Sequence, residues 1–247
     1  MGTLVVTGGS RGIGAAVCLA AATAGWDVVA NFVRDEAAAQ DVVRRILEAG
    51  GRATAVRADV SDAVDVERLF GAADSWLGPV TGLVNNAGIS GGAARVDEVA
   101  PQAVADVLAT NVVGPFLCCG AAVRRMSTRH GGSGGAIVNV SSRAAVLGSP
   151  GEWVHYAASK AAVDTLTVGL AQEVAAEGVR VNAIAVGLVD TEFHDSSGEE
   201  DRPGRIRPTV PMKRSGTPEE VAAAAVWLLS DAASYTTGTV LAVSGGR

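Results

Sequence analysis

Thr3-Leu-Val-Val-Thr-Gly-Gly-Ser-Arg-Gly-Ile-Gly14 places a glycine-rich turn directly after a short apolar run of β-forming residues. Its spaced glycines are Gly8, Gly12 and Gly14, a pattern that differs from the more common G-x-G-x-x-G. Small residues let the backbone approach a pyrophosphate closely, and the helix predicted over Ile13–Thr23 offers unpaired N–H groups at its N-terminus. A plain tight connection would also fit this pattern, but a position after the first strand favours a dinucleotide site.

Beyond this turn, apolar β-rich runs alternate with segments of helical period along the whole chain. The predicted strands are Thr3–Thr7, Asp27–Phe32, Ala53–Arg57, Gly82–Asn85, Ala136–Val140, Val179–Ile184 and Val240–Val243. The predicted helices are Ile13–Thr23, Glu36–Ala49, Val64–Trp76, Pro101–Met126, Tyr156–Glu177 and Pro218–Leu229. Such alternation gives right-handed crossovers and a parallel sheet with helices on both faces. We therefore expect an α/β fold of the Rossmann type, with a doubly wound, mainly parallel seven-stranded sheet in a single domain over residues 1–247.

The bulk composition restricts the class of protein. With 48% hydrophobic and 19% charged residues, the chain can bury a sizeable core. Its net charge of −6 gives no electrostatic reason to expect a nucleic acid or an anionic membrane as partner. Three cysteines, Cys18, Cys118 and Cys119, indicate buried thiols in a reducing compartment rather than disulfides or a metal site. Because a strand begins at Thr3, no room is left for a signal peptide, and we expect a cytoplasmic protein with no metal.

A tyrosine and a lysine stand four positions apart in Tyr156-Ala-Ala-Ser-Lys160. On a helix this spacing puts both side chains on one face, so the ammonium can lie near the phenol. A phenol with the ordinary pKa of about 10 is a poor acid or base at neutral pH unless a nearby cation stabilises the phenolate. The alternative is a core tyrosine beside a surface lysine. Because the chain holds two tyrosines and two lysines in all, chance rarely gives this spacing, which favours a tuned acid/base pair.

Together with its other motifs, the sequence resembles the short-chain dehydrogenases/reductases, in the branch with TGxxxGxG and YxxxK motifs, over essentially its whole length. The motifs that carry the resemblance are Thr7–Gly14, Asn85-Asn-Ala-Gly88, Asn111, Ser141-Ser142, Tyr156-x-x-x-Lys160, and Gly238 with Gly245-Gly246. The resemblance implies that Tyr156 exchanges a proton with the substrate oxygen, to which Ser142 donates a hydrogen bond. It implies that Lys160 holds the nicotinamide ribose and lowers the tyrosine pKa, and that Asn111 anchors a water beside Lys160.

The resemblance also implies a set of residues that bind the cofactor. They are Gly8, Ser10, Arg11, Gly12, Ile13, Gly14, Asn31, Arg34, Asp59, Val60, Asn85, Ala87, Gly88, Gly187, Val189 and Thr191, together with Tyr156 and Lys160. Within this set, Asn85, Ala87 and Gly88 would line the adenosine side. Asp59-Val60 would contact the adenine, and Thr191 would bind the carboxamide.

The sequence departs from the family pattern at two places. Val186-Gly187 stands where the family usually has Pro-Gly, which leaves this turn less constrained. Ser142 and Tyr156 are 14 positions apart, one more than is commonest in the family. The extra residue falls in Gly148–Trp153, a loop that we expect to border the substrate, with Trp153 as a pocket wall.

The choice between NAD and NADP depends on the end of the second strand. Enzymes of this fold that use NAD place an acid there to bind the ribose 2′-hydroxyl. Here the strand ends in Asn31-Phe32-Val33-Arg34, and Asp35 and Glu36 are better explained as the cap of the next helix. Arg11 and Arg34 could both reach a 2′-phosphate, for which a guanidinium is suited. NADP (NADPH) is therefore favoured over NAD.

Several further features bear on substrate and assembly. The polar segment Asp190–Pro211 is long for a connection, and we interpret it as a substrate lid over about 188–212. Arg143 either meets an anionic substrate or makes a salt bridge. The mechanism needs neither His155 nor His194, and we expect His155 at a partly exposed helix start. The resemblance implies a homotetramer, and the almost wholly apolar Val221–Leu229 agrees with this. Trp76 and Trp227 are predicted to lie in the core.

The function favoured by the sequence is the NADPH-dependent reduction of a ketone or aldehyde to an alcohol, with Tyr156 as general acid. The carbonyl compound could be a 3-oxoacyl thioester, a sugar or another small molecule. One alternative is an NAD-dependent alcohol or sugar dehydrogenase. A second alternative, from a different class, is a catalytically silent dinucleotide-binding sensor or scaffold, although such a protein has no chemical need for the Asn–Ser–Tyr–Lys set.

Overall fold

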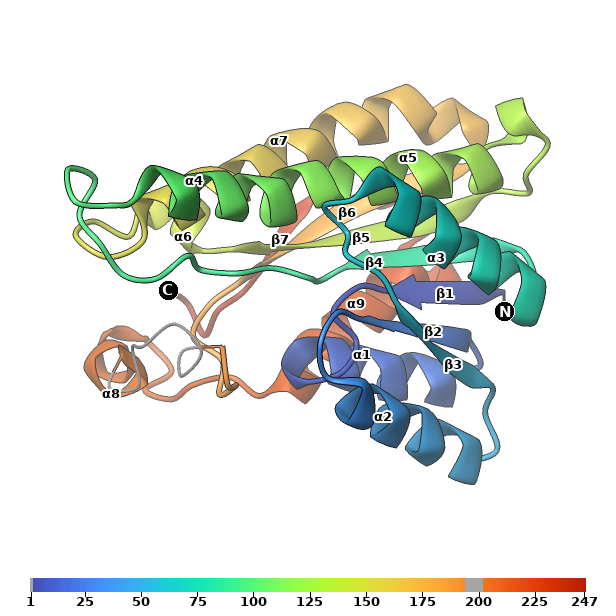
Figure 1. Ribbon diagram of the computed structural model, residues 1–247, viewed down its shortest axis with the longest axis horizontal. Coiled ribbons are helices and arrows are strands. Elements are labelled where there is room, and N and C mark those ends of the chain that lie inside the picture. Colours follow the sequence, from blue (N-terminus) through green and yellow to red (C-terminus); the bar gives the residue numbers. More distant parts are fainter. Residues whose placement is uncertain (1, 194–201) are drawn as a thin grey trace.

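One sheet of seven parallel strands forms the centre of the molecule, in the order β3-β2-β1-β4-β5-β6-β7 (Figure 1). In this computed structural model, which describes residues 2–193 and 202–247, the strands are β1 (Thr3–Val6), β2 (Asp27–Phe32), β3 (Ala53–Arg57), β4 (Val80–Asn85), β5 (Gly135–Ser142), β6 (Val179–Val186) and β7 (Val240–Val243). Every strand pairing between described residues is parallel. After β3 the chain returns to the other side of β1, which makes the sheet doubly wound. The predicted fold class is confirmed.

The predicted strands at Asp27–Phe32, Ala53–Arg57 and Val240–Val243 match the observed bounds. β5 and β6 run further than predicted, because the ladder continues until Ser142 pairs with Val186. Hydropathy alone ends β5 too early, since its last two residues are serines that still take part in the ladder.

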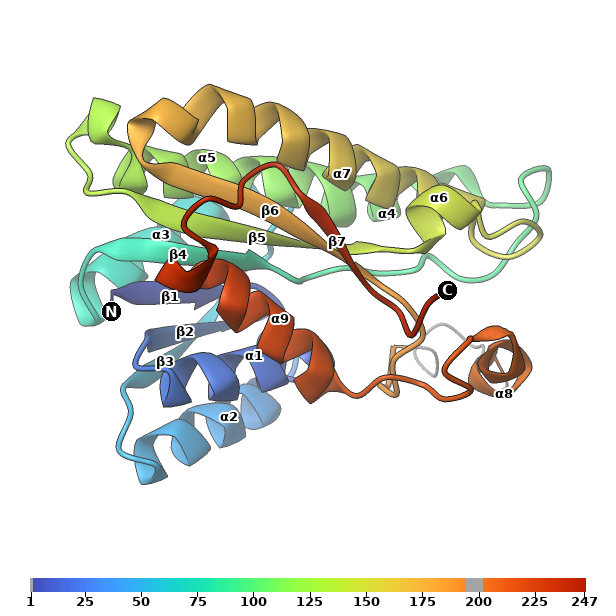
Figure 2. The ribbon, with the colours of Figure 1, turned by 180° about the vertical axis from the view of Figure 1, so that it is seen from behind.

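Helices cover both faces of this sheet. They are α1 (Gly12–Thr23), α2 (Glu36–Glu48), α3 (Ala63–Trp76), α4 (Pro101–Leu108), α5 (Gly114–Met126), α6 (Ala144–Leu147), α7 (Val154–Val174), α8 (Arg202–Ile206) and α9 (Pro218–Leu229). Figures 1 and 2 show α1, α2 and α9 on one face and α3, α5 and α7 on the other. Alternate strand residues serve the two cores, with Leu4 and Val6 facing α1 and α9 and Val5 facing the opposite layer. Because both faces are buried, the strands are continuous apolar runs.

The segment Pro101–Met126 is a single helical stretch in which a π-helix, Ala109–Val113, joins α4 to α5. By length and composition alone this stretch could cross a membrane. In the fold it covers the sheet between α3 and α7 (Figure 1). Arg124 in its last turns pairs with Glu67 of α3. One third, 33%, of its most apolar window is buried in the fold, and Leu108, Val113 and Phe116 remain exposed.

Two tryptophans lie where the sequence does not place them. Trp76 and Trp227 are 56% and 42% exposed, so the prediction that they belong to the core is wrong. Trp76 ends α3, beyond the turns that face the sheet. Trp227 lies off the buried side of α9, which consists of Val221, Ala222, Ala225, Leu228 and Leu229. An apolar helix has no clear inner face in its sequence, which explains the second error.

The polar segment that follows β6 is more ordered than a plain loop. It contains α8, and Leu188, Ile206 and Val210 form a small apolar cluster of their own. The part of the predicted lid at 194–201, with His194, lies outside the described residues. After the lid, Thr217 begins α9 with the expected cap, because its side chain accepts from the backbone of Glu220, whose carboxylate accepts from Thr217 N.

Candidate active site

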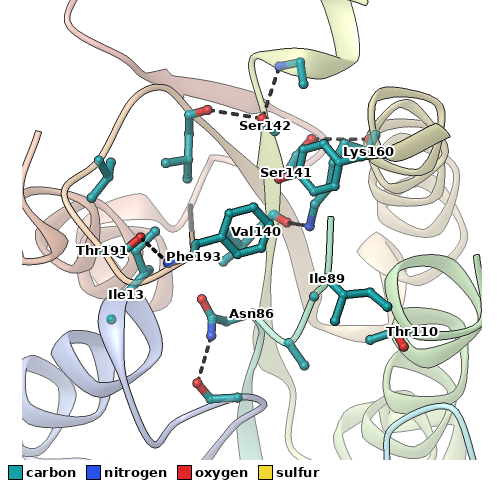
Figure 3. Close-up of a pocket in the computed structure, with 18 of the residues that line it drawn as sticks. Ile13, Asn86, Ile89, Thr110, Val140, Ser141, Ser142, Lys160, Thr191 and Phe193 are labelled. Atoms are coloured by element: carbon teal, nitrogen blue, oxygen red, sulfur yellow. Dashed lines mark hydrogen bonds between the residues drawn. The ribbon is translucent and has the colours of Figure 1, made fainter. Parts of the chain in front are cut away.

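The site lies where the carboxyl ends of β1 and β4 meet. Thr7 follows β1, and its Oγ1 accepts hydrogen bonds from the backbone N–H groups of Asn86 and Ala87 at 2.9 and 3.0 Å. In return, Asn86 Nδ2 donates to the carbonyls of Thr7 and Gly8 at 3.0 Å, and Asn86 itself lies on the cavity wall (Figure 3). This Thr7–Asn86 clamp holds two loops together at the point where the strand order reverses, the usual ligand site of open α/β sheets.

A cavity of about 850 Å³ opens beside the clamp. Its wall includes most of the residues singled out in the sequence: Gly8, Ser10, Arg11, Gly12, Ile13, Arg34, Asp59, Val60, Ala87, Gly88, Ser142, Tyr156, Lys160, Gly187, Val189 and Thr191. Four predicted site residues are not on this wall: Gly14, Asn31, Asn85 and Asn111. One cavity thus joins the glycine-rich turn to the Ser–Tyr–Lys set.

The glycine-rich turn has the properties that a pyrophosphate site needs. Gly8 and Gly12 adopt φ values of +61° and +52°, which a residue with a side chain rarely tolerates. α1 begins after Arg11 without any side-chain cap and without an acid in its first turn. Its N-terminal N–H groups are therefore available to an anion, in contrast to those of α2 and α3, which Asp35 and Asp62 cap. The turn fits the phosphates of a dinucleotide.

Gly14 and Asn31 act behind the turn rather than on its surface. An added Cβ at Gly14 would lie 2.1 Å from Gly8 O, so this glycine allows the helix to pack against the turn. Asn31 is 1% exposed, and its Oδ1 accepts from Gly8 N at 3.2 Å. Its Nδ2 donates to Ala58 O and Val56 O at 2.9 and 3.3 Å. Cofactor binding by these two residues stays a prediction, and the side-chain amide of Asn31 already has partners inside the protein.

Asn85 is likewise a buried structural residue. Its Nδ2 donates to Asn139 Oδ1 at 2.9 Å and to Cys119 Sγ at 3.3 Å, below the floor of the cavity. The neighbouring Asn86 takes the place on the wall that the sequence suggested for Asn85. Strand alternation could have signalled this, since the last residue of a buried strand is followed by one that points away from its core face.

Tyr156 lies in an aromatic group at one end of the cavity. Its ring centroid is 5.8 Å from those of both Trp153 and Phe193, and the residue is 9% exposed. Burial raises the pKa of the phenol above its ordinary value. A hydrogen bond with the Ser142 side chain and the positive charge of Arg202 oppose that rise without cancelling it. The phenol is therefore protonated at neutral pH.

Lys160 points into the same end of the cavity. Its Nζ donates to Val140 O at 2.8 Å and lies 5.7 Å from the Tyr156 ring centroid (Figure 3). Burial lowers the lysine pKa to about 8, against a smaller opposing effect of Asp164. Burial dominates the pKa of Tyr156, and the groups that oppose it are Ser142 and Arg202, so the lowering assigned to Lys160 stays a prediction.

Asn111 lies just behind the wall, in the π-helix between α4 and α5. Its Oδ1 accepts from Ile89 N at 2.9 Å, and its Nδ2 donates to Ile89 O at 2.8 Å and to Ser159 Oγ at 3.1 Å. π-Helices often mark functional sites. Through these hydrogen bonds, the side chain of Asn111 ties the loop after β4 to α7. Gly88 in that loop lies close to both Asn111 and Lys160, because a Cβ added at Gly88 would contact Asn111 Oδ1 and Lys160 Nζ.

The two departures from the family pattern take defined conformations. Gly187 N donates to Val243 O at 2.9 Å, so the β6–β7 ladder holds the Val186-Gly187 turn without a proline. In the lengthened loop, Ser149 adopts φ +44°, and Trp153 is buried and lines the cavity as expected. His155 is buried, not partly exposed, because its Nε2 lies 2.8 Å from Ser90 O.

Sequence reasoning missed several wall residues besides Asn86. The chief ones are Ile89, Thr110, Val140, Ser141, Glu192, Phe193, Arg202 and Arg247. Three of them, Ile89, Val140 and Phe193, are apolar and carry no sequence signal for a site. Arg202 lies in a segment without a motif and Arg247 follows the Gly245-Gly246 pair, and the tertiary fold brings both to this wall. Within the described residues no group of three or more His, Cys, Asp or Glu is placed to hold a metal ion.

Comparisons with known proteins agree with this geometry. A family model described as enoyl-(acyl carrier protein) reductase matches residues 8–247. The chain is 51% identical to the uncharacterized oxidoreductase YgfF of Escherichia coli over 247 residues, which cover 100% of both chains. It is 43% identical to 3beta-hydroxysteroid dehydrogenase 1 of Eggerthella lenta over 99% of this chain and 92% of that one. A solved blue fluorescent protein from a metagenomic library, in complex with NADPH, superposes with a TM-score of 0.91 at 33% identity, covering 99% of this chain and 97% of that one.

The chain belongs to the short-chain dehydrogenase/reductase family. It is an oxidoreductase that interconverts an alcohol and a carbonyl group with a nicotinamide dinucleotide.

The position of Asn31 leads to a test on the cofactor-free protein. Asn31→Ala should lower the free energy of unfolding by about 1–3 kcal/mol, because it leaves buried backbone groups without partners. Urea denaturation measures this, with Arg34→Ala in the exposed bend after β2 as a control that should change stability by less than about 0.5 kcal/mol. An unchanged urea midpoint combined with weaker NADPH binding would instead indicate that Asn31 contacts the cofactor directly.

Proposed function

We propose that this protein is an NADPH-dependent reductase of a ketone or aldehyde, with Tyr156 as the proton donor. The observation that carries the proposal is the buried Tyr156 phenol, held in its protonated form beside Ser142 in the cavity that also contains the glycine-rich turn. A donor must be protonated before it acts, so a raised phenol pKa suits reduction better than oxidation. The similarity to a hydroxysteroid dehydrogenase supports interconversion of a ketone and a secondary alcohol.

In this mechanism each residue has one task. Ser142 Oγ donates a hydrogen bond to the carbonyl oxygen and polarises it. When bound, the reduced nicotinamide supplies a hydride to the carbonyl carbon. Tyr156 then gives its proton to the developing alkoxide, and the Lys160 ammonium stabilises the phenolate that remains. Asn111 positions the loop that carries Gly88 beside Lys160, and the tie from Asn111 to Ser159 keeps α7 in register with that loop.

The dinucleotide would lie along the wall from the glycine-rich turn to Lys160. The N–H groups of α1 would bind the pyrophosphate, and Asp59, Val60 and Ala87 would border the adenosine. Gly187 and Thr191 would border the nicotinamide. We further propose that the segment 188–212 acts as a lid, and the proposal is supported by Thr191, Phe193 and Arg202, which line the cavity that holds Tyr156.

The experiment that tests the proposal is a screen for NADPH oxidation with ketones, 3-oxoacyl thioesters, quinones and sugars. Turnover of at least one class is expected. Tight NADPH binding without turnover of any class, in either direction, would support a silent sensor instead. Oxidation of alcohols or sugars with NAD, without reduction of any carbonyl compound, would support the dehydrogenase alternative.

The lowered pKa of Lys160 predicts a pH dependence. The ammonium is present below its pKa of about 8 and is lost as the pH rises through that value. We expect kcat/KM for NADPH, which reports groups of the free enzyme, to be constant at lower pH and to fall above about pH 8. In Lys160→Arg the charge persists, so this fall should disappear while kcat drops about a hundredfold, since a guanidinium does not reproduce the geometry of an ammonium. A wild-type profile that stays flat to high pH would contradict the assignment.

The charges at the adenosine end support NADP over NAD. Arg34 lines the cavity, and no described residue forms an ion pair with it. Arg11 pairs with Glu192 at 3.3 Å, an exposed pair that a phosphate can replace at little cost. The nearby acids are already engaged, because Asp35 caps α2 and Asp59 accepts from Ser61. One oxygen of each of these two carboxylates is thus engaged within the protein, which leaves them less available to a ribose 2′-hydroxyl.

This arrangement predicts that NADPH binds about tenfold or more tightly than NADH, the range that a charge-assisted hydrogen bond supports. Arg34→Ala should remove most of the difference by weakening NADPH binding. Fluorescence titration of both cofactors measures the dissociation constants. Equal affinities in the wild type, or an unchanged preference in the variant, would argue against the assigned role of Arg34.

We also propose that the protein is a homotetramer that works in the cytoplasm. Trp227 is exposed on α9, and β7 is the edge strand of the sheet with an unpaired edge, so both offer surface to another copy. The three cysteines are buried and free, as predicted, which suits a reducing compartment. Light scattering should give a mass near four times 24.8 kDa. A monomeric mass would refute the assembly.

A further inference from the structure

Three arginines gather at the end of the cavity that holds Tyr156. Arg143 follows Ser142, Arg202 begins α8, and Arg247 lies beyond β7; all three line the wall. We call them the arginine cluster. Figures 1 and 2 show the C-terminal end of the chain between α6 and α8, so segments far apart in the sequence meet here.

The carboxylates around the arginine cluster do not balance its charge. Within the described residues, 2–193 and 202–247, the cluster makes one ion pair, which joins Arg202 Nε to Glu152 Oε2 at 2.9 Å. The second oxygen of Glu152 accepts from Arg205 at 3.0 Å, so this carboxylate is shared. Arg143 Nε donates to the main-chain oxygen of Arg247, the last residue of the sequence, at 2.6 Å, and the charge of Arg143 also acts on the Asp164 carboxylate. Among the described residues, Arg202 is thus the one member of the cluster with a side-chain carboxylate partner, and it shares that partner with Arg205.

Of the three side chains in the arginine cluster, Arg247 has the least compensation for its positive charge. In the described part of the chain its guanidinium makes no hydrogen bond and no ion pair. Partial burial and the positive charge of Arg202 both lower its pKa, and Glu152 opposes them. A guanidinium remains charged under such conditions. A partly desolvated charge without a counter-ion is unfavourable unless a ligand supplies the anion.

The geometry connects this charge to the reacting end of the cavity. Arg202 is nearly buried, with a side chain 9% exposed, and its Cζ lies 4.0 Å from the Trp153 ring centroid. Tyr156 is also a neighbour of Trp153, at 5.8 Å between ring centroids. Arg202 and Arg247 also line an adjoining side cavity of about 200 Å³. A group held by these guanidiniums would therefore lie one aromatic ring away from the phenol.

We propose that Arg247 and Arg202 bind a carboxylate of the substrate, and that the substrate class is an oxo acid whose carboxylate and carbonyl are separated by a short carbon chain. The inference rests on the function proposed above and narrows its substrate. A guanidinium matches a carboxylate in a planar, bidentate geometry. Trp153 and Phe193 supply apolar walls for the intervening carbons. A neutral carbonyl compound would leave the charge of Arg247 unpaired in a closed site, and this cost selects against neutral substrates.

The test compares levulinate with its neutral methyl ester. Both are titrated by calorimetry into enzyme saturated with NADP⁺, where no turnover occurs. Wild type should bind the acid about tenfold to a hundredfold more tightly than the ester, the range of a charge-assisted hydrogen bond. In Arg247→Met the ratio of the two dissociation constants should approach one. The same pair used as NADPH-oxidation substrates should show the change mainly in KM.

Arg205→Met is the matched control, because Arg205 shares Glu152 with Arg202 yet lines neither cavity. This variant should keep the wild-type ratio. The inference is overturned if the wild-type enzyme binds levulinate no more tightly than the ester. It is also overturned if both variants lose the ratio of the two dissociation constants equally, because that result would reflect only the general positive charge of the region. The proposed function fails separately, if the wider carbonyl screen shows no NADPH oxidation.

Discussion

The Thr7–Asn86 clamp is the interaction on which the rest of the site depends. It joins the ends of β1 and β4 at the point where the strand order reverses, through four hydrogen bonds between two loops. Because Asn31 supports the glycine-rich turn from behind, the turn keeps its N–H groups directed into the cavity. The loop after β4 is held in turn by Asn111, which fixes its distance from α7. One arrangement of backbone hydrogen bonds thus places the phosphate end and the reacting end of the cavity in register.

Burial is the dominant electrostatic effect at the reacting end. It raises the pKa of Tyr156 and lowers that of Lys160, so desolvation acts in opposite directions on an acid and a base that lie side by side. Both groups consequently favour their uncharged forms more than they would in water. A protonated phenol beside a lysine that is charged below about pH 8 is the combination that a proton donor requires, because the cation becomes useful only once the proton has left.

The fold and the reacting residues follow from local sequence patterns, because strand–helix alternation and the Tyr–Lys spacing act within one turn or one element. The sequence is less informative where a side chain's partner is distant along the chain. Asn31 and Asn85 carry the right residue type at the right strand ends, yet their amides are engaged by Ala58 and Asn139, which no local pattern reveals. Arg202 and Arg247 reach the cavity only because β6 and β7 end beside each other, so their role is visible in the tertiary structure alone.

The central claim is that Tyr156 supplies the proton during carbonyl reduction, and Tyr156→Phe tests it most directly. The substitution keeps the ring between Trp153 and Phe193 and removes only the hydroxyl. Steady-state NADPH oxidation should show a kcat lower by about a hundredfold to ten-thousandfold, while fluorescence titration should show a much smaller change in NADPH affinity. A variant that retained kcat within about tenfold of wild type would contradict the account, because the proton would then have to come from another group.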